Sequence, residues 1–127
     1  QASSGVRAVT DVTGFALAGH GWEMAERSGC TFEIDTSMLP MYPGVLEAAQ
    51  RGVRTGGDAR NRTAVGTRVT LADGVDAAYD IVAFDPQTSG GLLAAVDPAA
   101  VAGLTAPGSP FVVIGKVVTG TPGLRLV

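Results

Sequence analysis

The sequence is poor in the residues that mark several common classes of protein. Cys30 is the only cysteine among 127 residues, so no disulfide can form within the chain, and we expect a reducing, cytoplasmic setting. Lys116 is the only lysine, and the formal net charge of −3 argues against a nucleic-acid-binding surface, which is normally basic. No apolar run approaches the roughly 20 residues that span a bilayer. We therefore expect neither a membrane nor a nucleic acid as partner.

The sequence also lacks an initiator methionine and begins with Gln-Ala-Ser-Ser-Gly. We expect residues 1–6 to be a tail or linker and residues 7–127 to form a single domain, which suits this length. Because the opening is not typical of a natural domain start, we also expect the chain to be part of a longer protein.

Hydrophobic patterning predicts an α+β fold. An apolar stripe at spacings of three or four residues predicts a long helix over 12–28 that ends at Gly29. Further helices are expected over 44–51 and behind Asp97, which stands in the N-cap position before Pro98. Strands are expected over 7–11, 30–35, 68–71, 79–84, 91–96 and 111–118, with 124–127 as a hairpin partner of the last. Without a strict β-α-β rhythm, we expect a layered mixed β-sheet with helices packed on it.

Asp11 opens the stretch Asp-Val-Thr-Gly-Phe-Ala-Leu-Ala-Gly-His and is the first candidate for a functional residue. The helix predicted behind it would place Asp11 at a helix N-terminus, where backbone N–H groups favour negative charge. Its carboxylate could cap the helix, or it could bind Mg²⁺ beside a phosphate, since Mg²⁺ prefers oxygen ligands. Spacing alone favours the cap, because no DxD or ExxE cluster supplies further ligands.

Glycine marks three further places in the sequence. Residues 55–61 (Thr-Gly-Gly-Asp-Ala-Arg-Asn) are expected to form a turn. Residues 85–91 (Asp-Pro-Gln-Thr-Ser-Gly-Gly) form either a structured turn between core strands or a loop that meets a ligand or partner subunit. They do not match the phosphate-binding P-loop, whose GK[ST] ending is missing. Gly19 and Gly21 are unfavourable within a helix and so predict close packing against another backbone.

The remaining reactive side chains are interpreted as structural. His20 is expected to be packed or capped within its helix rather than catalytic, and Cys30 to be a buried, inert thiol. One group of arginines forms either a solvated face, which we favour, or an anion-binding patch; it consists of Arg54, Arg60, Arg62 and Arg68.

Several of these segments together resemble the C-terminal domain of the selenophosphate synthetases (selenide, water dikinases), within the aminoimidazole ribonucleotide synthetase superfamily. The segments follow the family's order: Asp11–Phe15 with Gly19-His20, Gly56-Gly57 with Asn61, Asp85–Leu93, and Ile114–Val117. The stretch 85–93 is the most specific of them. Ala16 and Ala18 stand where the family often has glycine and leucine.

The resemblance implies an ATP-dependent enzyme that converts selenide, ATP and water to selenophosphate, AMP and phosphate. Such enzymes are homodimers with two domains per chain. Their N-terminal domain carries most of the ATP site, a catalytic cysteine or selenocysteine, a lysine and further metal-binding aspartates. One functional residue transfers to this chain, Asp11 as a ligand of Mg²⁺; no catalytic or cofactor-binding residue does. The chain alone is therefore expected to be inactive.

Two alternatives stay open beside this hypothesis. The chain could be a free-standing structural or regulatory module that pairs with a separate nucleotide-binding chain. It could instead belong to another ATP-dependent member of the same superfamily that acts on a different acceptor. The resemblance to the selenophosphate synthetases favours Asp11 as a metal ligand over Asp11 as a helix cap.

Overall fold

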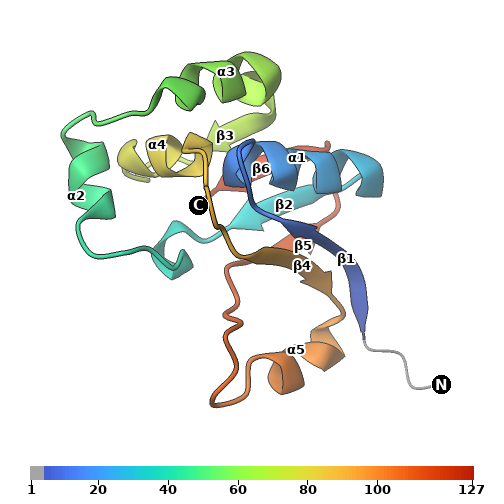
Figure 1. The fold of residues 1–127 in the computed structure, drawn as a ribbon. Coiled ribbons are helices and arrows are strands. Elements are labelled where there is room, and N and C mark those ends of the chain that lie inside the picture. Colours follow the sequence, from blue (N-terminus) through green and yellow to red (C-terminus); the bar gives the residue numbers. More distant parts are fainter. Residues whose placement is uncertain (1–4) are drawn as a thin grey trace.

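A four-stranded mixed sheet and a two-stranded ribbon organise the fold (Figure 1). The computed structural model describes residues 5–127, so most of the expected tail lies outside the described residues, and Val6 already belongs to a strand. The sheet has the order β3-β6-β2-β5. Its strands are β2 (Thr31–Ile34), β3 (Val69–Leu71), β5 (Gly115–Val118) and β6 (Gly123–Leu126). β6 runs parallel to both β2 and β3, and β5 runs antiparallel to β2.

The ribbon pairs β1 (Val6–Asp11) with β4 (Leu92–Val96) in antiparallel register, with Asp11 opposite Leu92. The helices are α1 (Ala16–Ser28), α2 (Val45–Gln50), α3 (Gly56–Val65), α4 (Ala78–Phe84) and α5 (Pro98–Leu104), with short 3-10 turns at Thr36–Met38 and Gly66–Arg68. α1 lies across β2 and β6 and also contacts α3 and α4, while α5 lies apart, beyond the ribbon (Figure 1). The expected α+β class, with helices packed on mixed sheets, is confirmed.

The core lies between α1 and the four-stranded sheet. Phe32 of β2 and Leu124 of β6 are buried there. Gly21 lets α1 approach β6, because a Cβ at this position would lie 2.8 Å from Cδ2 of Leu124. At Gly19 a Cβ would lie 2.7 Å from that of Phe15. The close packing predicted at both glycines is present, but against side chains and not against another backbone.

The segment 79–84 is helical, so the strand predicted there is wrong. In α4 the side chains of Ala78, Ile81 and Phe84 are buried at a spacing of three residues, which places them on one face of a helix. The turn expected over 55–61 is wrong as well, because α3 begins at Gly56.

The C-terminal strands also differ from expectation. Of the strand predicted over 111–118 only Gly115–Val118 forms, because its partner β2 has just four residues, and Phe111, Val112 and Val113 are exposed. β6 is not a hairpin partner of β5. It lies on the other side of β2, and the hydroxyl of Thr31 donates to the carbonyl oxygen of Thr121 in the connection between them (2.7 Å).

The remaining predicted elements are confirmed. Strands occur within 7–11, 30–35, 68–71 and 91–96, α2 occurs within 44–51, and Gly29 ends α1 with a left-handed φ of 64°. Asp97 precedes α5 in the N-cap position, with Pro98 in its first turn. Its side chain makes no cap hydrogen bond and instead accepts one from Nε of Arg7, across the ribbon (2.8 Å).

Candidate functional site

Asp11 is the last residue of β1, and its side chain is exposed to solvent. Among the described residues nothing donates a hydrogen bond to its carboxylate or pairs with it; only its backbone carbonyl accepts a bond, from the hydroxyl of Thr10. The predicted place at a helix N-terminus is wrong, because α1 begins at Ala16 with Phe15 in the N-cap position. A hydrogen bond from the N–H of Val12 to the carbonyl of Gly91 prolongs the ribbon beyond β1 (2.9 Å). Asp11 therefore does not cap α1.

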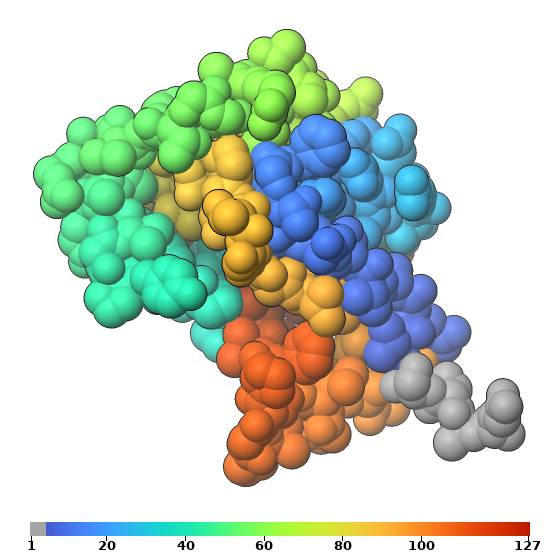
Figure 2. Space-filling view, in the orientation of Figure 1, coloured from blue at the N-terminus to red at the C-terminus, as the bar shows by residue number. Residues whose placement is uncertain are grey.

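Two connecting loops lie side by side next to this carboxylate. We call residues 11–15 the Asp11 loop and residues 85–91 the Asp85 loop. The N–H of Gln87 donates to the carbonyl of Thr13 (3.1 Å), and a Cβ on Gly90 would overlap the carbonyl oxygen of Val12. In Figure 2 the golden surface that includes the Asp85 loop lies directly against the blue surface that includes the Asp11 loop. The Asp85 loop is thus a structured connection between α4 and β4 that packs on the Asp11 loop.

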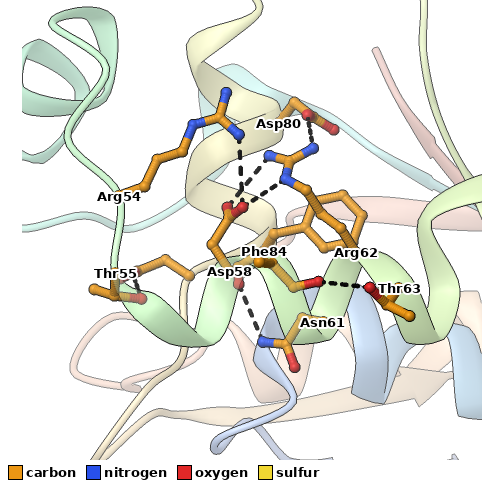
Figure 3. Close-up of polar contacts among 10 residues, drawn as sticks. Arg54, Thr55, Asp58, Asn61, Arg62, Thr63, Asp80 and Phe84 are labelled. Carbon is orange, nitrogen blue, oxygen red and sulfur yellow. Dashed lines mark hydrogen bonds and ion pairs between the residues drawn. The ribbon is translucent and has the colours of Figure 1, made fainter.

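Asn61 of α3 connects both loops from inside the molecule. Its Nδ2 donates to the carbonyl of Gly14 (3.0 Å) and to that of Phe84, the residue before the Asp85 loop (3.1 Å; Figure 3). Asn61 is 1% exposed, and within residues 5–127 its Oδ1 has no hydrogen-bond partner. Sequence reasoning included Asn61 in the resemblance without a role. In the sequence, the only feature that could have marked Asn61 as a functional candidate was an amide side chain within a glycine-rich segment.

His20 and Cys30 both occupy structural positions. His20 is buried in α1, as expected, with Nε2 hydrogen-bonded to Oγ1 of Thr13 at 2.8 Å and its ring centroid 5.6 Å from that of Phe15. The hydrogen bond to Thr13 ties the Asp11 loop to α1, in addition to its contacts with the Asp85 loop and with Asn61. Cys30 is only half-buried, which differs from the expected burial, and its Sγ donates to the carbonyl of Ser28 (3.3 Å).

Arg62 forms the centre of a charged cluster between α3 and α4 (Figure 3). Its Nε donates to Oδ1 of Asp58 at 2.6 Å, Nη1 donates to Asp80 at 2.5 Å, and the guanidinium lies 4.4 Å from the centroid of the Phe84 ring. Burial alone lowers the pKa of Arg62, but the hydrogen bonds to both carboxylates outweigh it, so the pKa stays above its ordinary value. Asp58, which is buried, also pairs with Arg54 at 3.5 Å.

Three of the four arginines are exposed to solvent, as the favoured interpretation of a solvated face expects: Arg54, Arg60 and Arg68. Arg54 and Arg62 are paired with carboxylates, and Arg68 lies 5.0 Å from the ring centroid of Trp22. Within residues 5–127, Arg60 is the one member of this group without such a partner. Arg62 alone departs from this interpretation, because it is half-buried and its contacts with Asp58, Asp80 and the ring of Phe84 join α3 to α4.

The geometry around Asp11 suits a single metal–carboxylate contact and no more. An exposed, unpaired carboxylate on a fixed backbone offers the hard oxygen that Mg²⁺ prefers. Residues 5–127 contain no group of three or more His, Cys, Asp or Glu side chains that could hold a metal ion by themselves. Any further ligands must come from a phosphate, from water or from another part of the protein.

Comparison with known proteins identifies the class to which the chain belongs. Residues 1–126 match the family described as AIR synthase related protein, C-terminal domain. The chain belongs to this family. No helix in the described part of the chain is both long enough and apolar enough to cross a membrane.

The curated relatives narrow this class further. The chain is 47% identical to a selenide, water dikinase of Pseudomonas straminea over 91 residues, or 72% of this chain and 26% of the relative. It is 44% identical to that of Treponema denticola over 69% of this chain and 25% of the relative, and 49% identical to that of Nitratidesulfovibrio vulgaris over 71% and 26%. The chain thus spans about a quarter of these relatives' length. The resemblance to a selenophosphate synthetase C-terminal domain is confirmed.

Proposed function

We propose that this chain is the C-terminal domain of a selenide, water dikinase and that Asp11 supplies one carboxylate oxygen to Mg²⁺ at bound ATP. The free, exposed carboxylate of Asp11 carries this proposal, because the backbone on either side of it is fixed while its side chain has no partner among the described residues. The whole protein would convert selenide, ATP and water to selenophosphate, AMP and phosphate. It would act as a cytoplasmic homodimer.

The surface around Asp11 supports a site completed by another domain. Three large apolar residues there are exposed to solvent: Val9 is 53% exposed, Leu92 58% and Phe15 51%. Val9 lies two residues before Asp11 on the same face of β1, and Leu92 lies opposite Asp11 across the ribbon. Exposed apolar residues gathered in one place mark a surface that another protein surface covers. The N-terminal domain, which we propose to precede this one, fits that role.

In the proposed reaction this chain would help to place the Mg²⁺ ion at the phosphates of ATP. Mg²⁺ bound at the phosphates neutralises their charge and orients them for transfer. The carboxylate of Asp11 would be held ready for this ion by the ribbon on one side and the Asp85 loop on the other. A ligand fixed before binding loses little conformational entropy when the metal arrives. The nucleophile and the nucleotide site would lie in the N-terminal domain.

The ligand role is tested by Asp11→Asn in the full-length protein. We expect Mg²⁺-dependent AMP formation from ATP and selenide to fall by on the order of 100-fold, at least as much as when a residue that merely orients a metal ligand is lost. Raising the Mg²⁺ concentration should recover part of the loss. Asp73→Asn is the control, because Asp73 is exposed in the turn after β3, away from the site.

Two outcomes would contradict the proposal in different ways. An Asp11→Asn enzyme with the normal Mg²⁺ requirement would exclude the ligand role. A full-length protein that phosphorylates an organic acceptor and not selenide would keep the family but change the reaction.

A further inference from the structure

Asn61 connects the two loops of the site through a single atom. Both hydrogens of its Nδ2 are used, one on the carbonyl of Gly14 in the Asp11 loop and one on the carbonyl of Phe84 at the start of the Asp85 loop. These carbonyls are 70 residues apart in the sequence, counted from 14 to 84. In Figure 3 the amide nitrogen points toward Phe84 and the oxygen points away from it.

The unpaired Oδ1 shows that the donor side of this amide matters. Reversing the amide would set Oδ1 against two carbonyl oxygens, which repel it, so the observed orientation is the only favourable one. Oδ1 is then left without a partner although Asn61 is 1% exposed, and an unpaired buried acceptor is unfavourable. An apolar side chain of this size would avoid that penalty. It would also leave both loops without their donor.

The surroundings of Asn61 make it a rigid support. The neighbouring Arg62 joins α3 to α4 through Asp80 and covers the ring of Phe84. Gly57, on the first turn of α3, lies so close to Pro86 of the Asp85 loop that a Cβ would overlap the proline ring. Since α3 is fixed against both α4 and the Asp85 loop, the amide of Asn61 has little freedom to follow a moving loop.

We propose that Asn61 is a positioning residue for Asp11: it holds the Asp11 loop against the Asp85 loop and so sets the direction of the Asp11 carboxylate. Only a few contacts connect Asn61 to Asp11. Asn61 fixes Gly14, the Asp85 loop holds Thr13 and Val12 through their backbones, and Val12 follows Asp11 directly. This inference rests on the proposed metal-binding role of Asp11.

The first test removes the donor while keeping the volume of the side chain. Full-length Asn61→Leu is compared with Val65→Ala, which removes buried atoms from the same helix but touches neither carbonyl. Mn²⁺ replaces Mg²⁺ as a spectroscopic probe, and its binding with a non-hydrolysable ATP analogue is measured by electron paramagnetic resonance. We expect about 10-fold weaker Mn²⁺ binding in Asn61→Leu, the low end for residues that orient metal ligands, and no change in Val65→Ala.

Amide hydrogen exchange gives a second readout that needs no metal. The N–H groups of Val12 and Gln87 bond across the two loops, so both should exchange faster in Asn61→Leu. Amides in connecting loops exchange through local opening, so both should keep the wild-type rate in Val65→Ala, which weakens the helix core and not the contact between the loops. Unchanged exchange at both amides in Asn61→Leu would overturn the proposal.

A second pair of variants separates the loops without touching Asn61. Gly90→Ala would push a methyl group into the carbonyl oxygen of Val12, whereas the methyl group of Gly66→Ala, outside both loops, meets no atom within 4 Å. We expect Gly90→Ala to weaken Mn²⁺ binding as Asn61→Leu does, and Gly66→Ala to bind normally. If Asn61→Leu fails to fold, this pair still tests whether the contact between the two loops positions Asp11.

Asp11→Asn, measured alongside, separates the two proposals. If Asp11→Asn weakens Mn²⁺ binding while Asn61→Leu and Gly90→Ala bind normally, Asp11 is a ligand and Asn61 does not position it. If Asp11→Asn binds Mn²⁺ normally, the ligand role itself fails, and the positioning role fails with it.

Discussion

Ala16 combines complete burial with a backbone conformation that alanine seldom adopts. Its φ is +66°, and no other non-glycine residue of the described chain has a positive φ. An L-residue in this region is destabilised by roughly 1–2 kcal/mol relative to its ordinary conformations. The strain lies at the start of α1, where the chain turns out of the Asp11 loop into the helix. A glycine at this position would adopt the same φ without strain.

Ala16→Gly should therefore be nearly neutral, within about 0.5 kcal/mol of the wild-type free energy of unfolding. Relief of the strain offsets the lost burial of a methyl group, about 0.8 kcal/mol, and the greater freedom of the unfolded chain, about 0.4–1 kcal/mol. Ala18→Gly is the matched control, because Ala18 is also fully buried but has ordinary helical geometry. It should lose about 1.5–2 kcal/mol. Equal losses for both variants in urea unfolding would show that position 16 is unstrained.

At the scale of single elements, sequence patterns succeed where apolar residues recur with the period of the element, and they fail where apolar residues follow one another directly or where the buried residues are polar. The strand β2 and the helix α1 were predictable because their apolar residues recur with the period of the element. The segment 78–84 is almost continuously apolar, and such a short run fits a strand and a helix equally well. α3 was missed because its two glycines suggest a turn and its polar residues point inward to other polar groups, Asp58 to Arg62 and Asn61 to backbone carbonyls.

The two glycines that begin α3 should respond differently to alanine. Gly57→Ala places a methyl group against the ring of Pro86, whereas Gly56→Ala meets nothing within 4 Å. Overpacking of this kind destabilises by about 1–3 kcal/mol, while alanine in an open helix position stabilises by up to about 1 kcal/mol. We expect Gly57→Ala to have the lower melting temperature of the two. If both variants melt together, the contact between α3 and the Asp85 loop is looser than the structure indicates.

At the scale of the whole molecule, the order of the strands depends on contacts distant in sequence. β6 lies between β2 and β3, where Leu124 and Leu126 are buried under α1, and not beside β5, its neighbour along the chain. This strand order also places Glu33 of β2 between two basic residues on the neighbouring strands. Its carboxylate oxygens lie 2.8 Å from Nη1 of Arg125 and 3.9 Å from Nζ of Lys116. A hairpin with β5 would have been the simpler connection, but it would leave these leucines without the helix that covers them.

The 127 residues by themselves should neither hydrolyse ATP nor bind it tightly with Mg²⁺. The described residues offer one unpaired carboxylate at the proposed site and no cluster that could hold a metal ion alone. Isothermal titration of the isolated chain with Mg²⁺ and ATP, together with an AMP-release assay, checks this expectation. The full-length protein under the same conditions is the control. Robust ATPase activity of the chain alone would place the catalytic groups within these residues and refute the two-domain proposal.

The sequence by itself determined the α+β class, the family resemblance and Asp11 as the residue of interest, because these depend on local patterns and on short motifs. Only the tertiary structure decided that Asp11 ends a strand and does not cap a helix, since the hydrogen bond from Val12 to Gly91 joins segments about 80 residues apart. It also brought Asn61 between the two loops. Such contacts depend on how the chain folds back on itself, and no pattern within a single segment records them.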